Sequence, residues 1–395
     1  MAALTTTFRN NRRVLTTGLY IVAALIVLAW LLPLIGGQRP YRLLQSTITG
    51  LLVGGVYSLI ALGIVVINKA SGVFNFAHGW MMLLGGLIFF SFYSSAVISP
   101  IAAIGLPLVT VIMALTANGW REIARPRSLM IGAIVVIVLA ALLLIDSPDW
   151  KLIRALIGAT VGGVLIGLVV ERFAIRPLIG QPLFAMVLMT LAISEVLHGV
   201  TQMTWGSVEL PLQVFNGVTA LGIPQPIRFQ SDALGGTIIV RTELLIAFLL
   251  AIIAFALFVG FFRFTSVGLS MRAIAENQKL GQSVGLRVRT ILAVAWAIAA
   301  LLAATAGVLQ GGASSLSLNM PLLALRAFPA VLLGGLESIP GALVGGLVIG
   351  LVQEWANLLF PGTQAGTELA PYVILMVVLI IRPDGLFGEK RIERI

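Results

Sequence analysis

The chain has 395 residues, of which 59% are hydrophobic and only 10% are charged. Soluble domains usually have about a quarter charged residues, so this composition excludes a water-soluble globular protein and indicates a protein of the lipid bilayer. The net charge of +10 does not indicate nucleic-acid binding, because the basic residues lie between apolar runs, as in the cytoplasmic loops of membrane proteins. The lack of cysteine excludes disulfides and thiolate metal sites.

The first predicted element is a helix near the N-terminus. Arg9, Arg12 and Arg13 precede an apolar run at 18–34, an arrangement that resembles a signal peptide. We favour a retained helix, because the run is long for a cleaved signal and no small-x-small cleavage site follows it. Residues 1–42 are therefore interpreted as a first transmembrane helix.

Eleven further apolar segments follow, each long enough for a helix that crosses all or part of a hydrocarbon core. Helices are expected because they satisfy every backbone group locally in lipid, and the alternation of a transmembrane barrel is missing. The fold class is therefore an all-α polytopic membrane protein with about 10–12 transmembrane or half-membrane helices. The segments lie at 43–67, 73–94, 98–117, 128–145, 152–171, 183–203, 243–262, 290–310, 322–336, 339–357 and 367–382.

One of these segments is unusual. The segment 322–336 is short for a full crossing and contains Arg326. It is therefore predicted to be one half of a broken or re-entrant helix that ends at Gly334 and Gly335.

The basic residues predict how the chain crosses the bilayer. Lys and Arg concentrate in cytoplasmic loops, and the loops at 121–127, 172–181 and 263–289 are all basic. They lie on the same side as the N-terminal arginines if the spans are as predicted, and the tail at 382–395 is basic as well. Both termini are therefore predicted to be cytoplasmic, and the loop 204–242 to be extracytoplasmic.

Glycines four residues apart occur inside several spans. Gly50 and Gly54 form one such pair, and Gly346 and Gly350 form another. Small residues at this spacing let helix backbones approach closely, so dense packing of a helical bundle is the favoured interpretation and a moving hinge is the alternative.

No signature of an enzyme is present in the sequence: the Gly-Lys-Ser/Thr phosphate loop, His-Glu-x-x-His and Gly-x-Ser-x-Gly are all missing. We therefore expect no catalytic residue and no cofactor. His78 and His198 lie far apart without a Cys or His at ligand spacing, so no metal site is expected. A transporter working alone would need intramembrane carboxylates, and the buried candidates are few, namely Glu195, Glu337 and Glu354.

The loop 263–289 is the longest predicted cytoplasmic loop that follows a span. Its middle predicts a short helix at 268–279, with Gly281 and Gly285 as terminating turns. A short helix at this place is typical of a docking element that receives motion from a cytoplasmic motor.

From about residue 45 to residue 388 the chain resembles the permeases of branched-chain amino acid ABC importers, of the LivH type, a family that also includes urea and amide permeases. Five motifs in the same order are similar to those of the family. They are GLLVGGVYSLIALGIVVINKASGVFNFAHG at 50–79, ERFAIRPL at 171–178, SMRAIAENQKLGQSVGL at 270–286, RAFPAVLLGGLESIPGALVGGLVIGLVQ at 326–353 and RPDGLFG at 382–388.

The resemblance implies a permease in the bacterial cytoplasmic (inner) membrane that carries branched-chain or hydrophobic amino acids inward. It also implies two cytoplasmic ATP-binding subunits, a second permease subunit, identical or homologous, and an extracytoplasmic solute-binding protein. A urea or short-amide permease is the first alternative. A secondary transporter that works without an ATPase is the second.

The resemblance and the polarity of these segments also name candidate residues. Asn75, His78, Glu195 and His198 are candidates for the translocation pathway. For Asn75 and His78 the alternative is a polar group satisfied within the bundle, and for Glu195 and His198 it is a buried ion pair that fixes two helices. The ATPase-coupling loop is expected to comprise Arg272, Ala273, Ile274, Ala275, Glu276, Asn277 and Gly285.

The chain departs from the family pattern in three places. Residues 1–42 would be an extra transmembrane helix, and the permease domain at 43–395 would contain an inserted helical hairpin at about 98–145. His198 also follows Glu195 where the family usually has apolar residues and a glutamine, so substrate choice is least certain there.

Overall fold

The structure is a computed structural model that describes residues 37, 39–95, 98–119, 125–207, 209–215, 226–276, 278–363 and 368–388. The first predicted helix, within 1–42, lies largely outside the described residues. All eleven segments predicted after it contain a helix, so the all-α polytopic fold class is confirmed. The described chain forms two compact units, one from residues up to 61 together with 217–249 and 326–395, the other from 62–216 and 250–325.

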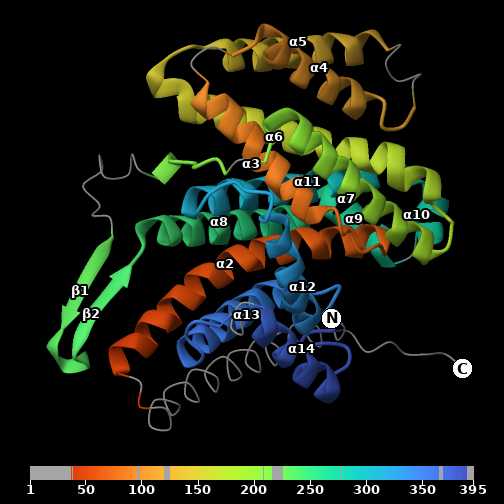
Figure 1. Cartoon of the computed structure of the whole chain (residues 1–395). Helices are drawn as coiled ribbons and strands as arrows, with labels where there is room; N and C mark the ends of the chain where they lie inside the picture. The colour runs from red at the N-terminus through yellow and green to blue at the C-terminus, as the bar shows by residue number, and fades with distance from the viewer. Residues whose placement is uncertain are drawn as a thin grey trace, which may run out of the picture. The chain divides into compact units, whose positions relative to one another are not determined.

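Apolar helices account for nearly all of the described chain (Figure 1). Seven described segments are long and apolar enough to cross a membrane, and α4, α12 and α14 are shorter apolar helices. The helices are α2 (Pro40–Ser71), α3 (His78–Ser94), α4 (Pro100–Leu115), α5 (Pro126–Leu144), α6 (Lys151–Val170), α7 (Leu183–Trp205), α8 (Thr242–Phe264), α9 (Ser266–Glu276), α10 (Gln278–Ser283), α11 (Val288–Ala313), α12 (Pro321–Gly334), α13 (Ile339–Leu359) and α14 (Ala370–Ile381).

In the first unit, α2 and α13 meet backbone to backbone through the paired glycines. A Cβ atom on Gly54 would lie 2.8 Å from the Leu347 Cα and 2.9 Å from the Gly346 carbonyl oxygen. Ser58, one turn further along α2, donates a hydrogen bond to the Leu343 carbonyl at 2.9 Å. The packing predicted for the Gly50–Gly54 and Gly346–Gly350 pairs is therefore confirmed.

A small antiparallel hairpin follows α7 in the chain, within the loop at 204–242. Strand β1 (Ile227–Ser231) pairs with β2 (Gly236–Val240), and Gly235 makes the turn with a positive φ of 68°. The side-chain amide of Gln45 on α2 holds the backbone of Ile239, donating to its oxygen at 2.5 Å and accepting from its nitrogen at 2.6 Å. This hairpin was not predicted.

The end of α12 is held by the C-terminal segment of the chain. The helix stops at Gly334, as predicted, and Gly335 turns the chain with a φ of 102°. The Leu386 amide donates to the Leu333 carbonyl at 2.8 Å, and the Phe387 amide donates to the Gly334 carbonyl at 3.1 Å. The motif RPDGLFG thus satisfies helix-end carbonyls that would otherwise lack a partner.

Arg326, the charged residue in the middle of the short helix α12, also has its ion-pair partner within the first unit. Arg326 forms an ion pair of 2.5 Å with Glu368, which lies two residues before the start of α14. An internal partner lowers the cost of an arginine in an apolar segment.

In the second unit, α3, α6 and α11 pack against one another through small residues (Figure 1). A Cβ atom on Gly163 of α6 would lie 3.1 Å from the Ala304 Cβ of α11, and one on Gly167 would lie 2.8 Å from the Ala297 Cα. Such close approaches of backbones are typical of membrane bundles, in which small residues take the place of a hydrophobic driving force.

Two helices of the second unit form the hairpin that the sequence predicted at about 98–145. Helices α4 and α5 lie side by side, and α4 also packs on α6 (Figure 1). That this hairpin is an addition to the family pattern stays a prediction.

Candidate functional site

Helical structure is interrupted between α2 and α3, inside the motif SGVFNFAHG. Gly72 has a positive φ of 71°, and residues 72–77 run without helical structure until α3 begins at His78. Thr190, a third of the way along α7, accepts a hydrogen bond from the Phe76 amide at 3.3 Å. The broken segment is therefore anchored on another helix.

Asn75 shapes this break. Its side chain is fully buried, and its Oδ1 accepts a hydrogen bond from the Ala77 amide at 3.1 Å. Its Nδ2 contacts the Met81 sulfur at 3.2 Å. Asn75 thus has the local partners of a turn-forming asparagine, the alternative that its sequence position left open.

His78 is different, because neither of its ring nitrogens has a hydrogen-bond partner although the side chain is fully buried. The ring lies against Gly63 of α2, where an added Cβ atom would lie 2.8 Å from the imidazole Nε2. Trp296 Nε1 of α11 is likewise buried and without a partner. Because nearly all buried polar groups in proteins are hydrogen-bonded, an orphaned imidazole needs a reason.

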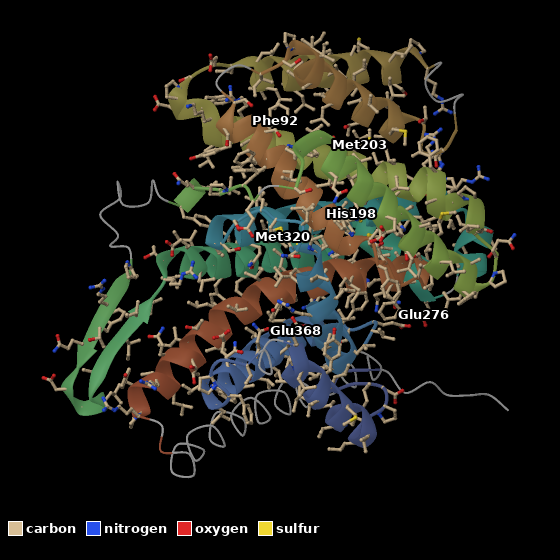
Figure 2. The ribbon with its side chains drawn as sticks, in the orientation of Figure 1. Phe92, His198, Met203, Glu276, Met320 and Glu368 are labelled. Carbon is tan, nitrogen blue, oxygen red and sulfur yellow. The ribbon has the colours of Figure 1, made fainter. Side chains whose placement is uncertain are left out.

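Glu195 and His198 lie on α7, and the structure contradicts the burial expected for Glu195. Its side chain is 78% exposed, and His198 is 32% exposed. The two belong to one helix, with 3.6 Å between the His198 Nδ1 and the Glu195 Oε2, so they are not a buried pair that fixes two helices. His198 instead stacks on Trp80 of α3, with ring centroids 4.3 Å apart (Figure 2).

Sequence reasoning missed Arg154, which is only 1% exposed inside α6. Its guanidinium donates to the Phe92 carbonyl at 3.0 Å and to the Ser95 carbonyl at 2.8 Å, and it lies 3.7 Å from Asp146. These carbonyls close the end of α3, so Arg154 caps that helix. The signal was one arginine in an otherwise apolar run.

The motif ERFAIRPL forms a charge cluster where α6 ends in a π-helical turn. Arg176 donates to both carboxylate oxygens of the buried Glu171, at 2.7 and 3.0 Å, and to the Ala117 carbonyl at 2.7 Å. Arg172 binds the hydroxyl of Thr116. The motif therefore joins the end of α6 to the residues that follow α4.

The predicted coupling helix is present as two short helices, α9 and α10, separated by Asn277, which lies outside the described residues. Met271 and Ile274 are buried and anchor α9. Arg272 binds the Phe262 carbonyl at the end of α8 and lies over the Phe262 ring at 5.3 Å. Its contacts are thus internal.

The other face of this element is exposed. Ala273 and Glu276 of α9 are exposed, Ala275 is half-buried, and Glu276 is visible at the edge of the second unit (Figure 2). Leu269 is 60% exposed and Val284 is 74% exposed. Gly285 ends the element with a positive φ of 87°, as expected for a terminating turn.

Among the described residues no group of three or more His, Asp or Glu side chains is arranged to hold a metal ion. The polar groups of the second unit instead fall into a broken helix, an exposed carboxylate on α7 and a two-helix projection between α8 and α11. The arrangement is that of a membrane bundle with a projecting loop.

Comparison with known proteins identifies the family of the chain. Residues 110–381 match the family described as the branched-chain amino acid transport system / permease component. The chain is 26% identical to the high-affinity branched-chain amino acid transport system permease protein BraD of Pseudomonas aeruginosa, over 90% of this chain and 99% of that protein. It is also 26% identical to the permease protein LivH of Escherichia coli, over 89% of this chain and 97% of that protein.

An archaeal relative extends the similarity. The probable branched-chain amino acid transport permease protein LivH of Methanocaldococcus jannaschii is 27% identical over 59% of this chain and 74% of its own length. Since the family model matches more than half of the sequence, the chain belongs to the family of branched-chain amino acid transport system permease components.

Proposed function

We propose that this chain is the membrane-spanning permease subunit of an ATP-driven importer that carries branched-chain or related hydrophobic amino acids into the cytoplasm. The observation that carries the proposal is the similarity to BraD and LivH along about nine-tenths of the chain. The apolar helices supply a membrane bundle, and the sequence contains no phosphate-binding loop. Energy therefore comes from partner subunits.

Two ATP-binding subunits are proposed to dock on α9 and α10. Leu269 and Val284 are exposed apolar side chains in a segment expected to be cytoplasmic, and exposed apolar patches in water mark sites of association. Met271 and Ile274 fix α9 on the bundle, so a push on the exposed face is transmitted to α8 and α11. Arg272 contributes by holding α9 against the end of α8.

A charge on the exposed face tests the docking. Leu269→Asp or Val284→Asp should reduce copurification of the ATPase at least about tenfold, because an ionised carboxylate resists burial in an apolar contact. Thr237→Asp, on the exposed face of β2, is the matched control, since the same charge is added on the side expected to be extracytoplasmic. Unchanged copurification for both docking variants would rule out this surface.

The remaining partners follow from the predicted topology. Both termini are proposed to lie in the cytoplasm of a bacterial cell whose inner membrane holds the protein. The loop that contains β1 and β2 would then face a solute-binding protein outside, and a second permease subunit, identical or homologous, would complete the transporter.

The broken segment at 72–77 is proposed to lie beside the path of the substrate. A fully buried imidazole without a partner costs free energy in this conformation, about 1–3 kcal/mol for an unsatisfied group. This cost is explained if His78 gains a hydrogen-bond partner, either water or substrate, when the bundle changes conformation. Alternating access driven by ATP would supply that second state.

Reconstitution tests the function as a whole. The purified chain, its ATPase and its binding protein are placed in vesicles, and uptake of labelled L-leucine is measured with and without ATP. ATP-dependent uptake supports the proposal. Uptake that persists without ATP and collapses with the proton gradient would instead show a secondary transporter, and ATP-dependent uptake of urea or acetamide but not leucine would show an amide permease.

A further inference from the structure

The middle of α7 carries an exposed charge. Glu195 lies twelve residues after Leu183 and ten residues before Trp205, or about 18 and 15 Å from the two ends of the helix. Among the described membrane helices, no other exposed charged side chain lies so far from a helix end. Hydrocarbon tails cannot cover such a carboxylate, because acidic groups at this depth face protein or water.

The exposed charge belongs to a continuous row, which we call the α7 seam. The seam has alternating spacings of four and three residues, so its members lie on one side of the helix. All are exposed, and they are Leu188, Ala192, Glu195, Gly199 and Gln202. The opposite side of α7 holds the buried Thr190 and Thr201 and packs on the bundle.

Beside the seam, α7 has an apolar flank. Val196 is 62% exposed and Met203 is 90% exposed, and both are turned by roughly 80–100° from Glu195 around the helix axis. Figure 2 labels Met203 and His198 on α7. This flank has the composition of a lipid-facing surface, so the seam and the flank meet different surroundings.

Dry packing of the seam against another helix is disfavoured by its own chemistry. Among the described residues, the basic side chain recorded beside Glu195 is that of His198, whose Nδ1 lies at 3.6 Å, beyond hydrogen-bond distance. In a closed twofold interface centred on Glu195 the two carboxylates would approach each other, because residues near the twofold axis meet their own copies. Like charges with no donor between them are strongly unfavourable when buried.

The two halves of the seam also differ. From Glu195 toward the end of the helix that is expected to be extracytoplasmic, the seam has Gly199 and Gln202, and a Cβ atom on Gly199 would meet nothing within 4 Å. Toward the other end it has Ala192 and Leu188. The carboxylate thus stands at the junction of a polar, open stretch and an apolar one.

We propose that the α7 seam lines a water-filled path open to the extracytoplasmic side, and that the Glu195 carboxylate attracts the ammonium group of the transported solute. The imidazole of His198, stacked on Trp80, lies beside the carboxylate, with its Nδ1 3.6 Å from the Glu195 Oε2. The ligand class is a small solute with a primary ammonium group, which an amino acid has and urea lacks. The identity of the solute rests on the proposed function, whereas the position of the seam does not.

Single cysteines test the seam, since the chain has no native cysteine. Ala192→Cys and Gly199→Cys place a thiol on the seam, and Val196→Cys, at the same depth, places one on the flank. In vesicles, membrane-impermeant methanethiosulfonate reagents should modify the seam thiols at least about tenfold faster than the flank thiol, because the reaction needs a thiolate in water. Full labelling of each variant after denaturation shows that every thiol is reactive.

Charge selectivity tests the carboxylate. At position 199 the cationic reagent should react about tenfold faster than the anionic one, the ratio that attraction and repulsion across roughly 6 Å of water would give. Each ratio is divided by the ratio measured with a small free thiol, because an anionic thiolate itself favours the cationic reagent. In a Glu195→Gln background this normalised ratio should fall to within about twofold of one. A ratio that does not change with Glu195→Gln, or equal labelling of seam and flank, would overturn the proposal.

Two further results separate the alternatives. A disulfide between two copies at position 199 without labelling would show a packed interface and overturn the water-filled path. In the complete transporter, Glu195→Gln should lower leucine uptake at least about tenfold, with partial rescue by Glu195→Asp, and wild-type uptake by Glu195→Gln would refute ammonium binding. If the unchanged protein shows no ATP-driven uptake, the proposed function fails, but the labelling pattern still decides where the seam lies.

Discussion

Replacing Gly54 by alanine gives the sharpest test of the contact between α2 and α13. The new methyl group would lie 2.8 Å from the Leu347 Cα and 2.9 Å from the Gly346 oxygen, both backbone atoms that no side-chain rotation can move. Ordinary contact begins near 3.4 Å, so the helices must separate by about half an ångström. Such overpacking costs about 1–3 kcal/mol.

The same substitution also has a favourable effect that must be subtracted. Alanine is about 1 kcal/mol better than glycine inside a helix, so the net loss for Gly54→Ala is about 0–2 kcal/mol. Gly260→Ala in α8 is the matched control, because its methyl group would meet nothing within 4 Å. That variant should gain up to about 1 kcal/mol, so the two variants should differ by about 1–3 kcal/mol.

Thermal unfolding in detergent measures this difference. Gly54→Ala should unfold about 1–4 °C below Gly260→Ala when each is compared with the unchanged protein. Equal or reversed midpoints would show that α2 and α13 are not in backbone contact. The comparison remains informative if both variants shift, because only the separation between them tests the contact.

Three further predictions test other contacts, by thermal unfolding, uptake or hydrogen exchange. Arg176→Ala leaves the buried Glu171 carboxylate without its bidentate partner and should destabilise by about 3–5 kcal/mol, whereas adding Glu171→Leu should recover much of the loss; no recovery would contradict the pairing. His78→Leu removes two orphaned nitrogens and should raise the unfolding temperature while lowering ATP-driven uptake, and a fall in both would contradict the idea that His78 acts in another conformation. Gly385→Ala, at a φ of 80° and with its methyl group 2.6 Å from the Leu332 oxygen, should detach RPDGLFG from α12 and raise its amide hydrogen exchange; unchanged exchange would refute the contact.

The membrane helices could be predicted closely from the sequence, because each must be apolar over its own length and ends where polar or turn-forming residues begin. The close packing at the glycine pairs on α2 and α13 could also be predicted, since a close approach of two helices requires small residues at fixed spacing. Both properties are local. The hairpin β1–β2 was not readable, because the side-chain amide of Gln45, almost two hundred residues away, binds its backbone.

The coupling segment shows the same division between local and distant information. Its helical character and its end at Gly285 follow from nearby residues, and both agree with the structure. The surroundings of Arg272 do not, because its partner is the carbonyl of Phe262 at the end of α8. The sequence therefore predicted a helix here but not its exposed face, on which Leu269 and Val284 lie.

Arg154 and Glu195 show why a charge inside an apolar run does not reveal its own surroundings. Both interrupt the apolar run of a membrane helix, and in both cases the sequence indicates only that the side chain needs polar groups or water around it. Arg154 finds it within the chain, in the carbonyls of Phe92 and Ser95, and is buried. Glu195 lies 3.6 Å from the His198 imidazole and stays exposed. A charge that its own chain leaves exposed halfway along a membrane helix needs water, solute or another subunit around it, and this need is the basis of our proposal that the α7 seam lines the path.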